Sequence, residues 1–144
     1  MFTPKKLLAE LIALPSVNPA FLPDKPEWSG EQRVADFLAH RADRVGLEIE
    51  FQEVFPGRSN VIIRLIPSGG KARQRILLAP HMDTVGVSDA SAFDPRKSCG
   101  RLHGRGACDT KGSVAAMFSA LLDMATNGPR PQKTEITFLG LLDE

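Results

Sequence analysis

Apolar residues recur at spacings of three and four in two segments near the amino terminus, a period that predicts amphipathic helices. The first helix is expected over residues 3–14 and stops at Pro15. The second is expected over residues 29–46, with Ser29 and Gln32 forming a capping box at its start. Both helices present an apolar stripe to a core, and neither carries candidate chemistry.

Strict alternation of apolar and polar residues replaces the helical period over residues 47–52, which predicts a strand with one solvated face. A second strand is expected over residues 60–66. Residues 76–79 are apolar throughout, as in a strand that is buried on both faces. A helix over residues 114–125 and a last strand over residues 134–142 complete the pattern. This order predicts an α/β fold, a mixed sheet flanked by helices, in which the last strand leaves an edge uncovered.

The composition excludes several classes of protein. Eighteen basic and 17 acidic residues give a net charge of +1, so there is no electrostatic footprint for nucleic acid or for an anionic membrane. No apolar stretch is long enough to span a bilayer. The two cysteines, Cys99 and Cys108, lack the close spacing of a zinc knuckle and suggest reduced thiols. We therefore expect a soluble, cytoplasmic protein.

His81 and Asp83 follow the apolar run directly after Pro80, at the expected carboxyl end of a strand. Open α/β sheets commonly bind ligands in the crevice beyond that end. In extended backbone, residues two apart point to one side, so Asp83 can accept a hydrogen bond from one imidazole nitrogen and leave the other for a metal. The alternative interpretation is a loop histidine with an unrelated acidic neighbour, because three-residue patterns arise easily by accident.

Asp109 stands in a second candidate segment, residues 100–112, whose four glycines suit tight turns with positive φ. The helical period begins at Val114, so Asp109 is predicted to lie just before a helix N-terminus, where the helix dipole favours an anion. Two interpretations stay open: Asp109 is a metal ligand, or it is only a helix-capping carboxylate.

The same turn ends in Lys111-Gly112-Ser113, which invites comparison with a phosphate-binding loop. That motif requires a glycine followed by Lys and then Ser or Thr, and here Lys and Gly stand in the reverse order. Phosphate or nucleotide binding by this turn is therefore the weakest of the functions considered.

Three motifs in this order resemble one family, the acetylornithine deacetylase, succinyl-diaminopimelate desuccinylase, aminoacylase and glutamate carboxypeptidase group of two-zinc hydrolases. His81-Met82-Asp83-Thr84-Val85 resembles the first metal motif of that family, and residues 100–112 resemble the second. Asp143-Glu144 is similar to the opening of its Asp-Glu-Glu motif. Three shorter stretches also fit the amino-terminal half of the family: residues 16–19, residues 30–31 and residues 56–60.

The resemblance implies a role for each matching residue. His81 and Asp109 would be zinc ligands, with Asp109 bridging two zinc ions, while Asp83 would orient His81 and Glu144 would be the general base. Imidazole and carboxylate groups are good zinc ligands, and cobalt or manganese are alternatives. The implied reaction is hydrolysis of an amide bond in an N-acyl amino acid or a short peptide by metal-activated water.

The sequence also departs from the family, because the second glutamate of the Asp-Glu-Glu motif, two later ligands and an inserted second domain are absent. Catalytic zinc sites generally use three protein ligands. We therefore expect residues 1–144 to be the amino-terminal part of a metallohydrolase catalytic domain, weakly active or inactive alone. Complete family members form dimers, and the state of this chain stays open. The alternative is a short product that binds a metal or a partner without catalysis.

Overall fold

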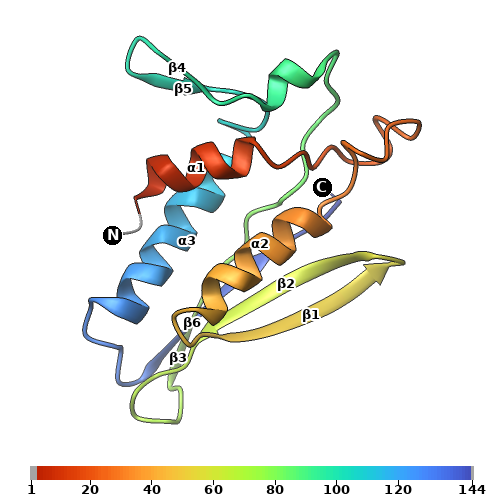
Figure 1. Ribbon diagram of the computed structural model, residues 1–144. Coiled ribbons are helices and arrows are strands. Elements are labelled where there is room, and N and C mark those ends of the chain that lie inside the picture. The colour runs from red at the N-terminus through yellow and green to blue at the C-terminus, as the bar shows by residue number, and fades with distance from the viewer. Residues whose placement is uncertain (1–2, 144) are drawn as a thin grey trace.

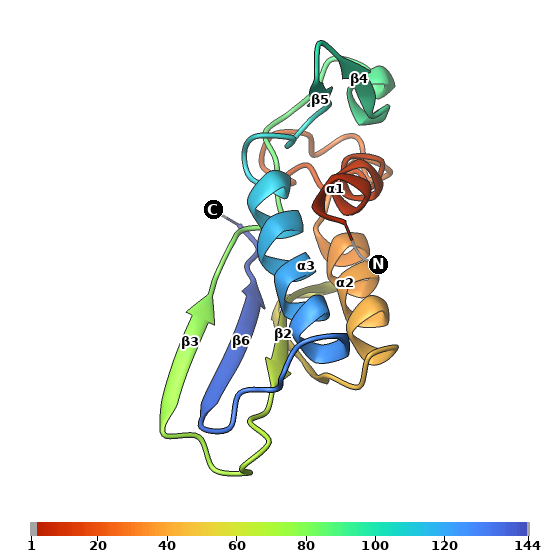
Figure 2. The same ribbon diagram turned by 90° about the vertical axis from the view of Figure 1, so that its left-hand side faces the viewer.

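A computed structural model describes residues 3–143 and shows a four-stranded sheet with three helices packed on one face (Figure 1, Figure 2). The strand order is β1-β2-β6-β3. The strands are β1 (Glu48–Phe55), β2 (Arg58–Leu65), β3 (Gln74–Leu78) and β6 (Thr134–Gly140). The helices are α1 (Pro4–Ile12), α2 (Gln32–Asp43) and α3 (Lys111–Thr126). The predicted fold class, an α/β fold with a mixed sheet and helices, is confirmed.

The core lies between the helices and the inner face of the sheet. β2 alternates buried and half-buried residues, and its buried side chains face the helices together with Phe138 of β6. Phe118 of α3 lies against Phe138 with ring centroids 5.4 Å apart. Burying rings of this size removes a large apolar area from water, so this layer supplies much of the stability of the fold.

The N-cap predicted for α1 is present, but the one predicted for α2 is not. Thr3 caps α1 by accepting a hydrogen bond from the backbone N–H of Lys6 at 3.4 Å. The capping box expected for the second helix is wrong, because Glu31 is the N-cap and makes no capping hydrogen bond with its side chain. Ser29 instead donates its hydroxyl to the backbone oxygen of Leu22.

Two expectations about the sheet are also wrong. The strand expected over residues 134–142 has no uncovered edge, because β6 pairs antiparallel with β2 and parallel with β3. The run over residues 76–79 is not buried on both faces, since Ile76 is 42% exposed and Leu77 is 61% exposed. Figure 2 shows β3 at the edge of the sheet, where within residues 3–143 it pairs only with β6. The apolar composition of residues 76–79 does not predict that β3 is an edge strand.

The connection between β3 and α3 contains secondary structure that the apolar periodicity did not predict. It contains a 3-10 helix, η1 (Ala90–Phe93), and a hairpin of β4 (Arg96–Ser98) and β5 (Arg101–His103). In Figure 1 this hairpin lies above α1, on the side away from the sheet. Within residues 3–143, no helix is both long and apolar enough to cross a membrane.

The parallel pairing of β3 with β6 brings their carboxyl ends together. Beyond these ends, His81 forms an isolated bridge with Leu141, and the backbone N–H of Met82 donates to the oxygen of Leu141 at 2.7 Å. The first and third sequence motifs, about 60 residues apart in the chain, therefore meet at one edge of the sheet.

Candidate metal centre

The segment after β3 is held firmly on both sides. Met82 is fully buried, and the backbone N–H of Thr84 donates to the oxygen of Ser16 at 2.9 Å. Ser16 in turn donates its hydroxyl to the oxygen of Met82 at 2.8 Å. These contacts fix the backbone from which His81 and Asp83 project.

His81 and Asp83 adopt the arrangement predicted from their spacing. The Nδ1 atom of His81 lies 3.1 Å from Oδ1 of Asp83, and the Asp83 side chain is buried. A buried carboxylate at this distance fixes the orientation of the ring. The interpretation of Asp83 as an unrelated neighbour of a loop histidine is wrong.

Asp109 approaches the opposite side of the same ring. Its Oδ1 atom lies 3.1 Å from Nε2 of His81, across 28 positions in the sequence, and its side chain is 81% exposed. The structure thus brings together three of the four predicted site residues, His81, Asp83 and Asp109. Glu144, the fourth, lies outside the described residues.

The turn that carries Asp109 is shaped by glycine. Gly106 has a φ of +79°, and a Cβ atom there would lie 2.8 Å from Cγ2 of Thr84. The backbone N–H of Lys111 donates to the oxygen of Gly106 at 2.8 Å, which closes the turn at the start of α3. Thr110 is the N-cap of α3 and Asp109 precedes it, joined by a cis peptide bond. Asp109 is directed to His81 and does not serve as the helix cap.

Lys111 is a buried residue that makes hydrogen bonds inside the protein. Its side chain is fully buried, and its ammonium group donates to the backbone oxygens of Leu11 at 2.9 Å and Leu14 at 2.6 Å. Burial, together with repulsion from Arg33, lowers the pKa of Lys111 to about 7. The ammonium group therefore ties α3 to the carboxyl end of α1, and the phosphate-binding alternative, which needs it at the surface of the turn, gains no support.

The donor atoms present fit a zinc ion. Two ligands of one tetrahedral zinc, each at about 2.0–2.1 Å, lie roughly 3.3 Å apart, close to the 3.1 Å that separates His81 Nε2 from Asp109 Oδ1. Imidazole nitrogen and carboxylate oxygen are also the ligand types that zinc takes. Among residues 3–143, however, no group of three or more His, Cys, Asp or Glu side chains is arranged to hold a metal. The described part of the chain thus offers two of the ligands that a catalytic zinc generally needs.

Sequence reasoning gave no role to Asn18 and Arg58, which border this centre. Asn18 donates from Nδ2 to Asp83 and to Asp143, each at 2.9 Å, and Arg58 pairs with buried Glu31. Hydrogen bonding to Glu31 raises the pKa of Arg58. The only signal in the sequence was that these residues lie in the shorter stretches that resemble the family.

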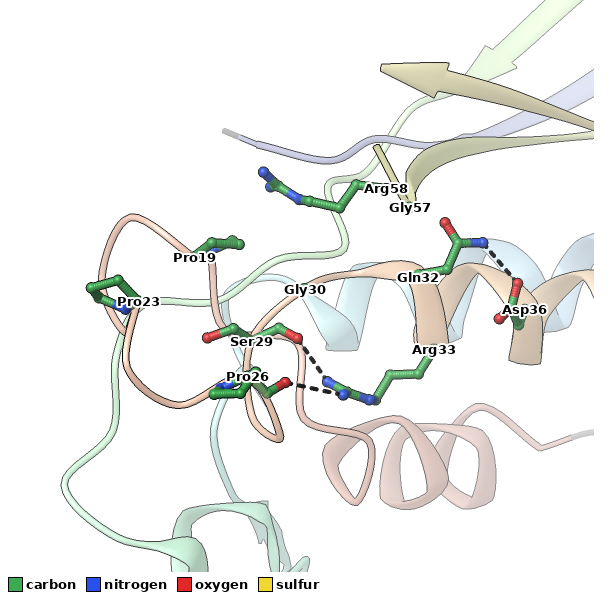
Figure 3. Close-up of a pocket in the computed structure, with 10 residues that line it drawn as sticks. All are labelled: Pro19, Pro23, Pro26, Ser29, Gly30, Gln32, Arg33, Asp36, Gly57 and Arg58. Atoms are coloured by element: carbon green, nitrogen blue, oxygen red, sulfur yellow. Dashed lines mark hydrogen bonds between the residues drawn. The ribbon is translucent and has the colours of Figure 1, made fainter. Parts of the chain in front are cut away.

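A pocket with a volume of about 540 Å³ lies beside Arg58 of this network (Figure 3). Arg58 and Pro19 line one part of it, and Arg33 of α2 lines the opposite part. Arg33 donates to the backbone oxygens of Ser29 and Pro15, each at 2.9 Å, so its guanidinium group holds the loop in place. The pocket is open to solvent, and Arg58 links it to Asp143; neither His81 nor Asp109 lines it.

Comparisons with known proteins agree with this fold and these motifs. The M20 family metallo-carboxypeptidase Sso-CP2 of Sulfolobus solfataricus shares the fold, with a TM-score of 0.75 and 19% identity, over 97% of this chain and 30% of that chain. The acetylornithine deacetylase of Vibrio campbellii is 35% identical over 67% of this chain and 26% of its own length. The succinyl-diaminopimelate desuccinylase of Rhodopseudomonas palustris is 34% identical over 99% of this chain and 35% of its own length.

A family model described as peptidase family M20/M25/M40 matches residues 77–144, which include all four predicted site residues. The chain belongs to this family, and the resemblance drawn from the three motifs is confirmed. The chain spans about a quarter to a third of the length of the curated relatives it matches.

Proposed function

We propose that this chain forms the amino-terminal part of a catalytic domain that hydrolyses amide bonds in N-acyl amino acids or short peptides. The observation that carries the proposal is the contact of His81 with Asp109 on one side and with Asp83 on the other. The names of the relatives, a deacetylase and a desuccinylase, support the substrate class. A cytoplasmic location stays a prediction.

The proposed division of labour rests on the family resemblance and is supported, for His81, Asp83 and Asp109, by the contacts between their side chains. His81 and Asp109 would hold zinc, or cobalt or manganese in its place, and Asp83 would keep the imidazole ring in its ligating orientation. Such a metal supplies Lewis-acid activation of water and of the amide carbonyl. Glu144 would accept the proton of the attacking water and pass it to the leaving amine. Asp83 is a positioning residue in this scheme.

The test is a zinc titration of the purified chain, followed by an assay of N-acetyl and N-succinyl amino acids and dipeptides. We expect saturable zinc binding that is lost in His81→Ala, and low turnover that a chelator removes. Turnover is expected to be low because the described residues supply two donors. Amide hydrolysis that survives both the chelator and His81→Ala would overturn the proposal.

Neither alternative function gains support from a specific observation. The alternative of a short product that binds a metal or a partner without catalysis predicts a native protein of 15.7 kDa that shows no turnover. Nucleotide binding predicts thermal stabilisation by nucleotide that depends on Lys111 and is indifferent to His81. The buried position of Lys111 gives no basis for that result.

A further inference from the structure

Asn18 lies between two carboxylates that come from distant parts of the chain. Its Nδ2 atom is 2.9 Å from Oδ2 of Asp83 and 2.9 Å from Oδ1 of Asp143. Asp83 stands behind the ring of His81, and Asp143 directly precedes Glu144. One side-chain amide therefore touches both halves of the proposed site, the half that holds the metal and the half that leads to the proposed base.

The orientation of the Asn18 amide is fixed by its other contacts. Its Oδ1 atom accepts a hydrogen bond from the backbone N–H of Ala20 at 3.0 Å, so the NH₂ group must face the two carboxylates. The backbone N–H of Asn18 donates to the oxygen of Thr84 at 2.9 Å, and the residue is almost completely buried. Every polar group of the side chain is thus satisfied in one arrangement.

An amide suits this position better than other side chains. Two ionised carboxylates only accept hydrogen bonds, and the NH₂ group of asparagine offers one hydrogen to each. A serine would offer one hydrogen, and an aspartate at position 18 would add a third negative charge beside Asp83 and Asp143. Without the amide, the two carboxylates would face each other with no donor between them.

Asp143 is held from a second side by Arg58. The Nη2 atom of Arg58 lies 3.4 Å from Oδ1 of Asp143, and the same guanidinium group donates to both oxygens of buried Glu31, at 2.8 and 2.7 Å. This fork is rigid because it uses two parallel hydrogen bonds. Asp143 has a φ of +62°, a backbone conformation that residues with side chains adopt rarely, so these contacts help to keep it there.

We propose that Asn18 is a positioning residue that fixes the separation between the metal-binding His81 and the segment carrying Glu144, by clamping Asp83 and Asp143 with one amide. The inference rests on the proposed function for its role in catalysis. The clamp itself is a property of the described residues and is testable without a metal. Arg58, seated on Glu31, supports the clamp from the other side of Asp143.

The experiment compares the wild-type chain with Asn18→Ala and with Asn127→Ala, an exposed asparagine at the end of α3 that serves as the matched control. Two quantities are measured: zinc affinity by isothermal titration calorimetry, and the heteronuclear NOE of the Asp143 amide without metal. We expect Asn18→Ala to weaken zinc binding by about 10- to 100-fold, the usual effect of removing a residue that supports a ligand. We also expect it to lower the NOE, while Asn127→Ala changes neither quantity.

The outcomes separate this inference from the proposed function. If the wild-type chain binds no zinc, the proposed function fails, and the NOE of Asp143 alone decides the role of Asn18. If folded Asn18→Ala keeps both the zinc affinity and the NOE of the wild type, the clamp is overturned, even if its stability falls. Should Asn18→Ala fail to fold, Asn18→Ser, which keeps one donor, is expected to show both changes at smaller size.

Discussion

The Nε2 atom of His81 lies 3.1 Å from Oδ1 of Asp109, although the two residues are 28 positions apart in the sequence. His81 follows the edge strand β3, and Asp109 precedes the helix α3. The parallel pairing of β3 with β6 sets the position of His81, and the glycine turn before α3 sets the position of Asp109. A carboxylate and an imidazole at the distance expected for two ligands of one zinc are the basis of the proposed function.

Asp83 supports His81 from behind, so replacing it with its neutral isostere tests that support. Asp83→Asn keeps the size of the side chain and removes the charge that orients the ring. We expect zinc affinity to fall by about 10- to 100-fold. Calorimetric titration measures this fall, with Asp94→Asn, in an exposed loop, as the control. Equal affinities for the two variants would show that Asp83 does not support the ligand.

Lys111 makes the stability of the fold depend on pH. Its ordinary pKa is 10.5 and burial lowers it to about 7 in the folded chain, so between these values the unfolded chain binds more protons. The free energy of unfolding therefore rises as pH increases from 7 toward 10, and this contribution is lost as pH falls through about 7. Lys111→Met, which cannot titrate, should lack this slope in urea unfolding.

The control for this slope is Lys133→Met, which removes an exposed lysine. It should keep the pH dependence of the wild type between pH 7 and 10. If Lys111→Met and the wild type show the same slope, the buried ammonium group does not titrate in this range.

Adding a methyl group at Gly106 or at Gly46 distinguishes backbone strain from overpacking. Both have positive φ, but nothing lies within 4 Å of a Cβ at Gly46, whereas a Cβ at Gly106 would press on buried Thr84 and Lys111. Gly46→Ala should cost about 1–2 kcal/mol, from the left-handed backbone alone. Gly106→Ala should cost about 1–3 kcal/mol more, from overpacking. Urea unfolding measures the free energy of unfolding of both variants. Equal decreases would mean that the turn at Gly106 moves to make room for the methyl group without a further cost.

Phe138 and Leu77 test the one-sided core. Phe138 is fully buried under α3, so Phe138→Ala should lower the free energy of unfolding by about 3–5 kcal/mol. Leu77 on β3 is mostly exposed, so Leu77→Ala should change it by about 0.5 kcal/mol or less. Urea unfolding measures both. A loss above 2 kcal/mol for Leu77→Ala would mean that β3 is covered in solution.

The local sequence predicted contacts between residues close together in the chain, but not contacts between distant segments of the site. The spacing of His81 and Asp83 predicted their contact because extended backbone has a fixed period of two. The clamp at Asn18 could not be predicted, since it joins segments 65 and 125 positions apart through one side chain. The exposure of Leu77 was missed for a similar reason: strand order decides burial, and an apolar run looks alike at the centre and at the edge of a sheet.

A zinc titration of the purified chain and of two histidine variants, His81→Ala and His103→Ala, tests whether His81 binds the metal. His103 lies exposed on β5 and is the matched control. We predict saturable zinc binding to the wild type and to His103→Ala, and loss of that binding in His81→Ala. Binding that persists unchanged in His81→Ala would show that His81 and Asp109 do not form the metal-holding pair.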